Sequence, residues 1–171
     1  MALIAIIGPS GAGKSTLINM YLAEHPEAKL YKSATTRPRR DQADTSHNFM
    51  TDERFDEAKA KGELLPSVEV YGYRYALPKI SDTSGVNFVL IRAQFVPGLK
   101  AIFPDARVIQ IEAPIELLIS RLRERGDISR ASETALTEEI EHGRLASDAV
   151  IVTNQLMSDS YEQFERTVQT N

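Results

Sequence analysis

Residues 8–15 carry the clearest chemical signal in the chain. They read Gly-Pro-Ser-Gly-Ala-Gly-Lys-Ser and match the phosphate-loop pattern G-x-x-x-x-G-K-[ST] without deviation. Glycines let the backbone wrap closely around a phosphate chain, so that several N–H groups point at it. Lys14 is placed to reach the β- and γ-phosphates, and the Ser15 hydroxyl is placed to ligate Mg²⁺. The pattern predicts binding of ATP and Mg²⁺ by Gly8, Ser10, Gly11, Ala12, Gly13, Lys14, Ser15 and Thr16.

The flanking elements fit this interpretation. The apolar run Leu3–Ile7 directly precedes the loop and is typical of a strand buried on both faces of a parallel sheet. A helix with apolar residues at helical spacing is expected from Lys14 to Ala23, so its N-terminus would face the phosphates with its positive dipole end.

Strand and helix patterns alternate along the rest of the chain. Further apolar runs predict strands at residues 88–91, 107–111 and 149–152. Helices are expected to begin near Thr51, Pro114, Ser132 and Ser158. Two extended stretches, 64–70 and 73–77, indicate a hairpin-like insert. Alternating strands and helices predict an α/β fold with a parallel sheet flanked by helices.

A second cluster of basic residues follows the first helix. Residues 33–40 read Ser-Ala-Thr-Thr-Arg-Pro-Arg-Arg in a turn-rich stretch. Arg37 and Arg40 stand three positions apart, and two such guanidinium groups can offer bidentate donors to one phosphate dianion. The alternative is a solvated surface cluster.

These segments together resemble the guanylate kinase family. The resemblance rests on GPSGAGKST, on Ser33-Ala34-Thr35-Thr36-Arg37-Pro38-Arg39-Arg40, on Glu69-Val70-Tyr71-Gly72 and on Arg121-Leu122-Arg123-Glu124-Arg125-Gly126. It covers nearly the whole chain. It implies the fold of the phosphate-loop NTPases as a single kinase domain. Its parts would be a nucleotide-binding core (1–32, 81–120 and 146–171), an acceptor-binding insert (33–80) and a helical lid (121–145).

The resemblance also implies the activity and the residues that perform it. The expected reaction is transfer of the γ-phosphate of ATP to a small phosphorylated acceptor, with GMP as the usual acceptor of the family. By position, the acceptor would be bound by Ser33, Arg37, Arg40, His47, Glu69, Tyr75 and Arg92. The residues expected to act in transfer are Lys14, Arg37, Arg121 and Arg125. Phosphoryl transfer needs in-line positioning and positive charge more than covalent chemistry, and cationic side chains with Mg²⁺ would supply that charge.

The sequence departs from the family where the acceptor base is read. The family has a glutamate where this chain has Pro66, and a serine or threonine where it has Leu77. An aspartate pair of the family is matched by Leu90 and Arg92, so Mg²⁺ would rest on Ser15, phosphates and water. Lost polar partners should lower discrimination for guanine strongly. Either GMP is not the best acceptor or other residues read it.

A more anionic acceptor is the first alternative. The ribose 1,5-bisphosphate phosphokinases of phosphonate metabolism are similar to guanylate kinases with an altered base pocket, and Arg92 and Arg74 would suit a second phosphate. A non-catalytic guanylate-kinase-like binding module is the second alternative. Such modules typically have degraded phosphate loops, whereas Lys14 and Ser15 are intact here.

Composition narrows the remaining classes. The 171 residues contain no cysteine, which excludes disulfide scaffolds, thiolate zinc sites and cysteine nucleophiles, and the three histidines lie far apart in sequence. The formal net charge of −4 argues against non-specific nucleic-acid binding. No apolar run approaches the roughly 20 residues of a membrane span. The expectation is a cytoplasmic monomer or homodimer whose partners are small molecules.

Overall fold

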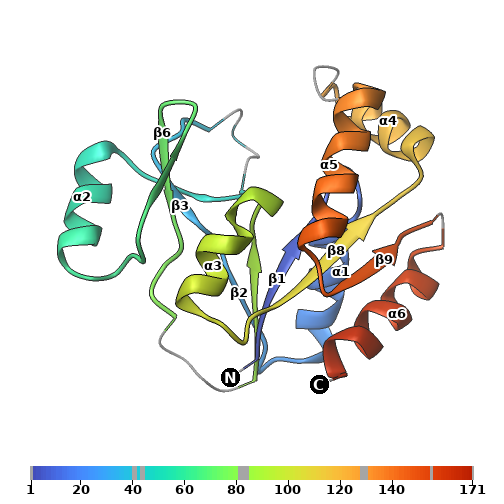
Figure 1. Ribbon diagram of the computed structural model, residues 1–171, viewed down its shortest axis with the longest axis horizontal. Helices are drawn as coiled ribbons and strands as arrows, with labels where there is room; N and C mark the ends of the chain where they lie inside the picture. Colours follow the sequence, from blue (N-terminus) through green and yellow to red (C-terminus); the bar gives the residue numbers. More distant parts are fainter. Residues whose placement is uncertain are drawn as a thin grey trace. The chain divides into compact units, whose positions relative to one another are not determined.

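A computed structural model of the chain describes residues 2–39, 42, 45–80, 85–127, 131–154 and 156–170 (Figure 1). The chain forms two compact units. One consists of Met1–Lys29 with Ser84–Asn171, and the other of Leu30–Thr83. The first unit contains the phosphate-loop pattern, and the second contains the basic segment that begins at Ser33.

The larger sheet belongs mainly to the first unit. Among the described residues its strand order is β2-β7-β1-β8-β9. The strands are β1 (Ala2–Ile7), β2 (Lys29–Tyr31), β7 (Val86–Leu90), β8 (Arg107–Glu112) and β9 (Ala149–Val152). β1 pairs in parallel with β7 and β8, and β8 pairs in parallel with β9. The central strands are fully buried, as at Ile4, Phe88 and Ile109. The predicted parallel α/β fold is therefore confirmed.

Helices cover both faces of this sheet. They are α1 (Lys14–Glu24), α3 (Val96–Ile102), α4 (Ile115–Glu124), α5 (Glu133–Ala146) and α6 (Met157–Gln169). On one face, the rings of Tyr21 in α1, Phe88 in β7 and Phe164 in α6 pack with centroids 5.3–6.1 Å apart. On the opposite face, Gln110 of β8 donates a hydrogen bond to the Ile140 carbonyl of α5 (2.9 Å). Among the described residues, no helix is long and apolar enough to cross a membrane.

Two elements differ from the sequence prediction. A short 3₁₀ helix (Ala93–Phe95) and α3 fill a stretch for which no helix was expected. The last helix begins at Met157 with Leu156 as its N-cap, so the prediction that Ser158 caps this helix is wrong. The Ser158 hydroxyl instead donates to the Asp159 carboxylate (3.3 Å).

The second unit contains a small mixed sheet and one helix. Its strands are β3 (Ala34–Thr35), β4 (Asn48–Phe49), β5 (Val68–Val70) and β6 (Tyr73–Ala76), in the order β4-β3-β6-β5. The predicted helix is α2 (Asp52–Ala60), and the Thr51 hydroxyl caps it by accepting from the Arg54 N–H (3.3 Å). Phe55 of α2 is fully buried against the sheet.

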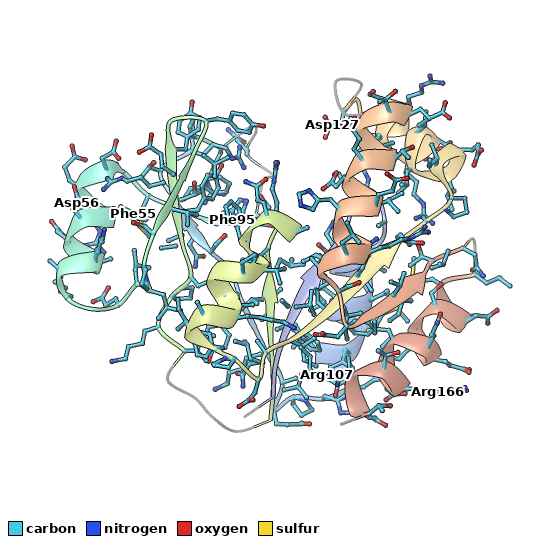
Figure 2. All side chains as sticks on the ribbon, viewed as in Figure 1. Phe55, Asp56, Phe95, Arg107, Asp127 and Arg166 are labelled. Atoms are coloured by element: carbon cyan, nitrogen blue, oxygen red, sulfur yellow. The ribbon has the colours of Figure 1, made fainter. Side chains whose placement is uncertain are left out.

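An arginine ties this sheet to α2. The Arg74 guanidinium lies 4.7 Å from the centre of the Phe55 ring and pairs with Asp52 (2.6 Å) and Asp56 (2.5 Å), both on α2. Figure 2 shows Phe55 and Asp56 on that helix. Arg74 was considered above as a partner for a second acceptor phosphate. Its guanidinium is instead engaged by two carboxylates.

An ion pair between a buried carboxylate and an exposed arginine fixes α5 to the larger sheet. Glu112, at the end of β8, is 3% exposed and receives two hydrogen bonds from Arg144 of α5 (2.5 and 2.9 Å). Gln110 donates to the same carboxylate (2.8 Å). Burial raises the pKa of the Glu112 carboxyl, but the hydrogen bonds from Arg144 and Gln110 outweigh this effect and hold the pKa below its usual value.

Replacing Arg144 with alanine is expected to lower the free energy of unfolding at pH 7 by about 2 kcal/mol, because a buried carboxylate loses its cation. A carboxyl with a lowered folded-state pKa stabilises the fold above its unfolded-state pKa, and this stabilisation is lost as the pH falls through the folded-state value. The difference between wild type and R144A should therefore shrink below about pH 4. Urea denaturation at several pH values measures the free energy of unfolding of both proteins. A difference that does not depend on pH would contradict the ionic role of Arg144.

Candidate functional site

The phosphate loop follows directly from β1. Gly8 has φ +127°, and a Cβ at this position would lie 1.9 Å from the Ile111 carbonyl oxygen of β8. Only glycine lets the chain turn so close to the neighbouring strand. The turn directs the loop across the ends of β1 and β8 and into the first turn of α1, which begins at Lys14 as predicted.

Lys14 folds back over this loop. Its Nζ donates hydrogen bonds to the carbonyl oxygens of Gly8 (2.6 Å) and Pro9 (2.7 Å). In both bonds a charged donor meets a neutral backbone acceptor. An anionic phosphate oxygen is a stronger acceptor for the ammonium group and would replace these carbonyls. The ammonium group of Lys14 is therefore held against the carbonyl oxygens of the loop.

Three further cationic side chains from the predicted site act on the same loop. Burial lowers the pKa of the Lys14 ammonium to about 8; the charge of Glu139 opposes this shift, and the charges of Arg92 and Arg125 add to it. Arg121 donates to the carbonyls of Gly11 (2.9 Å) and Asn154 (3.2 Å). In the first unit Arg121 of α4 thus contacts the loop, whereas Arg92 and Arg125 act on Lys14 through their charges.

Sequence reasoning missed one polar contact of the loop. The Thr153 hydroxyl lies 2.8 Å from the Ala12 carbonyl oxygen and 3.2 Å from that of Glu112. Thr153 and Ala12 are both fully buried. No pattern in the sequence marks this threonine, since 141 positions separate it from Ala12.

Binding of a triphosphate should change the protonation of Lys14. With a pKa of about 8 in the free protein, the amine is half protonated at pH 8, and a bound polyphosphate would restore the full charge. We expect an uptake of about half a proton per ATP bound at pH 8 and more at pH 9, with affinity falling over the same range. Titration calorimetry in buffers of different ionisation enthalpy measures the uptake. No uptake at either pH would contradict the lowered pKa.

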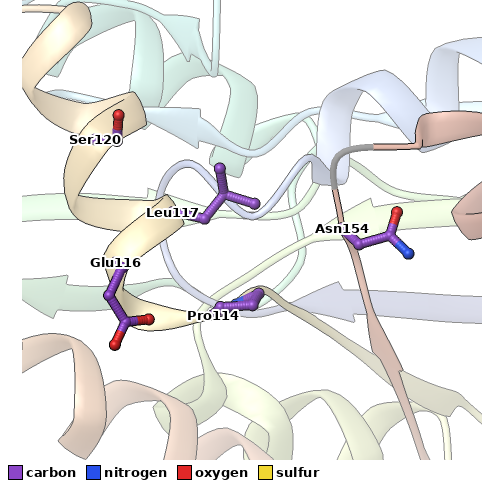
Figure 3. A pocket seen from close by; sticks show the side chains of 5 residues that line it. All are labelled: Pro114, Glu116, Leu117, Ser120 and Asn154. Atoms are coloured by element: carbon purple, nitrogen blue, oxygen red, sulfur yellow. The ribbon is translucent and has the colours of Figure 1, made fainter.

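An open pocket of about 410 Å³ lies in the same unit. It is lined by Pro114, Glu116, Leu117, Ser120 and Asn154 (Figure 3). The Asn154 carbonyl accepts a hydrogen bond from Arg121, whose guanidinium also donates to the Gly11 carbonyl of the loop. A flat, partly apolar group attached to a phosphate chain could use such a surface.

The second unit gathers a separate set of predicted residues. The buried Ser33 hydroxyl lies 2.7 Å from His47 Nδ1. The His47 ring meets those of Phe49 and Tyr75 edge to face, with centroids 5.9 and 5.7 Å away. Three of the residues expected to bind the acceptor, Ser33, His47 and Tyr75, therefore lie together.

Arginines border this cluster. The guanidinium carbons of Arg37 and Arg39 lie 5.1 and 4.8 Å from the centre of the Phe49 ring. Arg40, also expected to bind the acceptor, lies outside the described residues. Glu69 is opposite Arg74 in the β5–β6 ladder, whereas Tyr75 is opposite Val68. Side chains alternate along a strand, so Glu69 and Tyr75 face opposite sides of the sheet and the structure does not bring them together.

Comparison with known proteins shows where this architecture belongs. The model of the guanylate kinase family matches residues 1–171. The chain belongs to the guanylate kinase family. A curated guanylate kinase from Nostoc sp. (strain PCC 7120) is 32% identical over 94% of the chain and 83% of its own length. One from Ralstonia nicotianae is 43% identical over 73% of the chain and 60% of its length.

Solved structures agree on the fold. A guanylate kinase from Anaplasma phagocytophilum superposes with a TM-score of 0.70 and 21% identity, over 99% of this chain and 84% of its own. A shikimate kinase from Acinetobacter baumannii gives a TM-score of 0.55 and 14% identity, over 98% and 93%. The family resemblance and the phosphate-loop NTPase fold are thus confirmed. As a member of the guanylate kinase family, the chain is a phosphotransferase of the nucleoside monophosphate kinase type.

The Ser15 hydroxyl is the expected metal ligand of the phosphate loop. Ser15 is exposed in the first turn of α1. The nearby carboxylate of Glu112 is buried and engaged by Arg144. Mg²⁺ keeps several water ligands and usually binds through phosphates, so one hydroxyl beside a triphosphate fits its chemistry. Guanylate kinase family members use ATP and Mg²⁺ generally.

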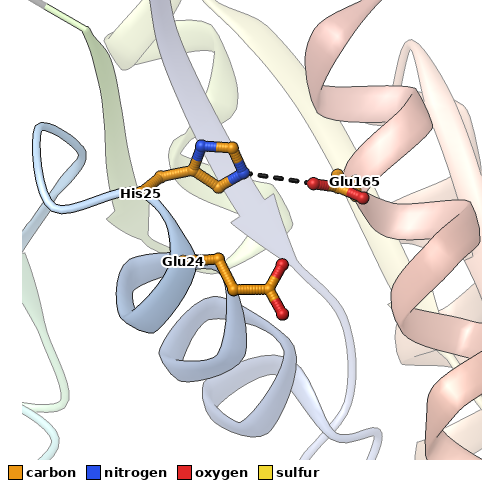
Figure 4. Close-up of side chains that lie close together, drawn as sticks. All are labelled: Glu24, His25 and Glu165. Carbon is orange, nitrogen blue, oxygen red and sulfur yellow. Dashed lines mark hydrogen bonds and ion pairs between the residues drawn. The ribbon is translucent and has the colours of Figure 1, made fainter.

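One group of possible metal ligands lies on α1 and α6. Glu24, His25 and Glu165 place their ligand atoms within 4.8 Å of one another. His25 stacks on Tyr21 and shares a hydrogen bond with Glu165 (3.1 Å; Figure 4). Glu24 accepts a hydrogen bond from the Tyr161 hydroxyl of α6 (2.8 Å), so this bond and the His25–Glu165 bond both have the structural role of joining α6 to the end of α1.

Proposed function

We propose that the protein is an ATP-dependent kinase that transfers the γ-phosphate to a small phosphorylated acceptor, with GMP as the first acceptor to test. The observation that carries this proposal is the formed phosphate loop, with Lys14 held over the carbonyls of Gly8 and Pro9. Arg121 on the same loop supports it further. The relatives' name, guanylate kinase, supports GMP as the acceptor.

The first unit would hold the donor. The triphosphate would lie on the loop from Gly8 to Thr16, where backbone N–H groups and the N-terminus of α1 favour anions. The nucleoside would occupy the pocket beside Leu117 and Asn154. Ser15 would hold Mg²⁺, which neutralises charge on the bound phosphates.

The second unit would hold the acceptor. Its phosphate would be bound by Ser33, Tyr75 and the arginines of the basic segment, because hydroxyls and guanidinium groups are the usual donors to phosphate. An acceptor phosphate is already anionic at neutral pH, so its oxygen can attack without a strong base. His47 would therefore orient Ser33 by its hydrogen bond and would not act as the base.

Catalysis would then be electrostatic. Charge on the transferring phosphoryl group would be stabilised by Lys14, Arg37, Arg121 and Arg125. Arg121 now binds the Gly11 carbonyl, a weak partner that a phosphate could displace. In this proposal residues 121–145 form the lid that carries Arg121 and Arg125, and residues 33–80 form the acceptor-binding insert that carries Arg37.

Pro66 and Leu77 offer no side-chain hydrogen-bonding partner to a guanine edge, so these positions do not favour GMP. A sugar bisphosphate is the second candidate. Arg92 favours it, because this cation stands near Lys14 where the family has a carboxylate. Arg74 does not favour it, because Asp52 and Asp56 engage its guanidinium.

An acceptor panel tests the proposal. ADP release from ATP and Mg²⁺ would be measured with GMP, dGMP, AMP, UMP and ribose 1,5-bisphosphate. We expect one acceptor to raise kcat/KM at least about a hundredfold above the others, since one lost polar contact alone changes discrimination by such factors. Strong turnover of GMP and no turnover of ribose 1,5-bisphosphate would exclude a sugar bisphosphate as the acceptor. Absence of ATP binding would leave only a non-catalytic binding module.

A further inference from the structure

We infer that Thr153 is a positioning residue of the phosphate loop, whose hydroxyl sets the direction of the peptide between Ala12 and Gly13. The inference rests on the proposed function, because it concerns how the loop binds the phosphates of ATP. Thr153 directly follows β9, at the end of the sheet where the loop lies. It assigns a role to a side chain that no phosphate-binding pattern includes.

The hydrogen bond is direct and shielded from water. Thr153 Oγ1 is 2.8 Å from the Ala12 carbonyl oxygen, and both residues are 0% exposed. The threonine itself is fixed, because its backbone N–H donates to the Glu112 carbonyl at the end of β8 (2.7 Å). A buried carbonyl that loses its donor has no water to replace it, so the bond matters more than an exposed one.

The geometry of the peptide unit links this bond to the ligand. A trans peptide is planar, and its C=O and N–H point in opposite directions. A hydroxyl that holds the Ala12 carbonyl toward β8 and β9 therefore directs the Gly13 N–H away from them. Gly13 has φ +94° and immediately precedes Lys14, so its N–H is one of the donors that a phosphate nest would use.

Thr153 differs from the other groups that bind the loop's carbonyls. Lys14 holds those of Gly8 and Pro9, and Arg121 holds that of Gly11. Both are cations that would turn to the phosphates when the nucleotide binds. Thr153 is neutral and buried, so its contact can persist with the nucleotide bound and keep the loop in one shape.

The first test compares two substitutions at this position. Thr153→Val keeps the shape and removes the hydroxyl, whereas Thr153→Ser keeps the hydroxyl. We expect T153V to weaken ATP binding about tenfold and to raise the KM for ATP, with the KM for the acceptor unchanged. T153S should bind ATP within about twofold of wild type. Calorimetry with ATP and Mg²⁺ and steady-state kinetics provide these values.

The matched control is Thr167→Val. It also removes a threonine hydroxyl that donates to a backbone carbonyl, that of Gln163 in α6, and it should leave ATP binding unchanged. If T153V does not fold, Thr153→Cys, a weak donor, is used, and it should bind ATP more weakly than T153S.

The possible outcomes separate the two proposals. Wild-type affinity for ATP in T153V or T153C, or a T153S protein as impaired as T153V, would overturn the role of the Thr153 hydroxyl. Such a result would leave the proposed function standing. A wild-type protein that does not bind ATP would overturn the proposed function and this inference together.

Discussion

Replacing Lys14 with methionine is expected to lower kcat/KM for phosphoryl transfer by about a thousandfold or more, equivalent to about 4 kcal/mol of transition-state stabilisation. Lys14 is the cation held directly over the loop by the carbonyls of Gly8 and Pro9. Methionine keeps the length and apolar stem of the side chain and removes the charge. Because the transferring group is anionic throughout, no neutral side chain can replace this contribution.

The control for K14M is Lys59→Met, which removes an exposed ammonium on α2 that bonds to the Ser67 hydroxyl. It should leave kcat/KM within about twofold of wild type. Circular dichroism of both variants should show the wild-type fold. A folded K14M enzyme with more than about a tenth of the wild-type kcat/KM would contradict the role assigned to the lysine.

Replacing Gly8 with alanine is expected to be the most damaging change to the fold of the site. The new Cβ would lie 1.9 Å from the Ile111 carbonyl oxygen, in a backbone conformation with φ +127°. Neither strand can move easily, because β1 and β8 are paired at the centre of the sheet. We expect the free energy of unfolding to fall by about 4 kcal/mol or more and ATP binding to be lost.

Gly98→Ala provides the comparison for this variant. Gly98 lies in α3, and nothing lies within 4 Å of a Cβ built there. Alanine favours a helix over glycine, so G98A should be neutral or stabilising by up to about 1 kcal/mol. Urea denaturation and ATP titration of both variants test the pair. A G8A protein with wild-type stability and affinity would show that the close approach at Gly8 is not required.

The elements around the phosphate loop could be predicted because their signals are local. The apolar strand, the glycine pattern and the helix from Lys14 are adjacent in sequence, and each agrees with the others. The 3₁₀ helix and α3 escaped prediction because both are short and because α3 contains Pro97 and Gly98, residue types with low helix propensity. The N-cap of α6 was misplaced because Ser158 is a good N-cap residue by type, but Leu156 is the N-cap and the helix begins at Met157.

Contacts between distant residues could not be predicted from residue types. Arg74 was as plausible a phosphate ligand as any basic residue of its segment, and only the fold brings Asp52 and Asp56 to it. The pairing of Glu112 with Arg144 likewise depends on the fold, because 32 positions separate the two residues. Thr153 carries no signal at all, because its partner is Ala12 at the other end of the chain.

The central claim is that this chain transfers the γ-phosphate of ATP to a phosphorylated small molecule. It is tested most directly with ATP labelled in the γ-phosphate, GMP as the first acceptor and Mg²⁺, for wild type and K14M. We expect wild type to form labelled product and ADP in a ratio of about one to one, and K14M to form neither at a comparable rate. If wild type binds ATP but labels no acceptor of the panel, this chain does not transfer the γ-phosphate to any of them. If K14M labels the acceptor as well as wild type does, Lys14 does not have the assigned role.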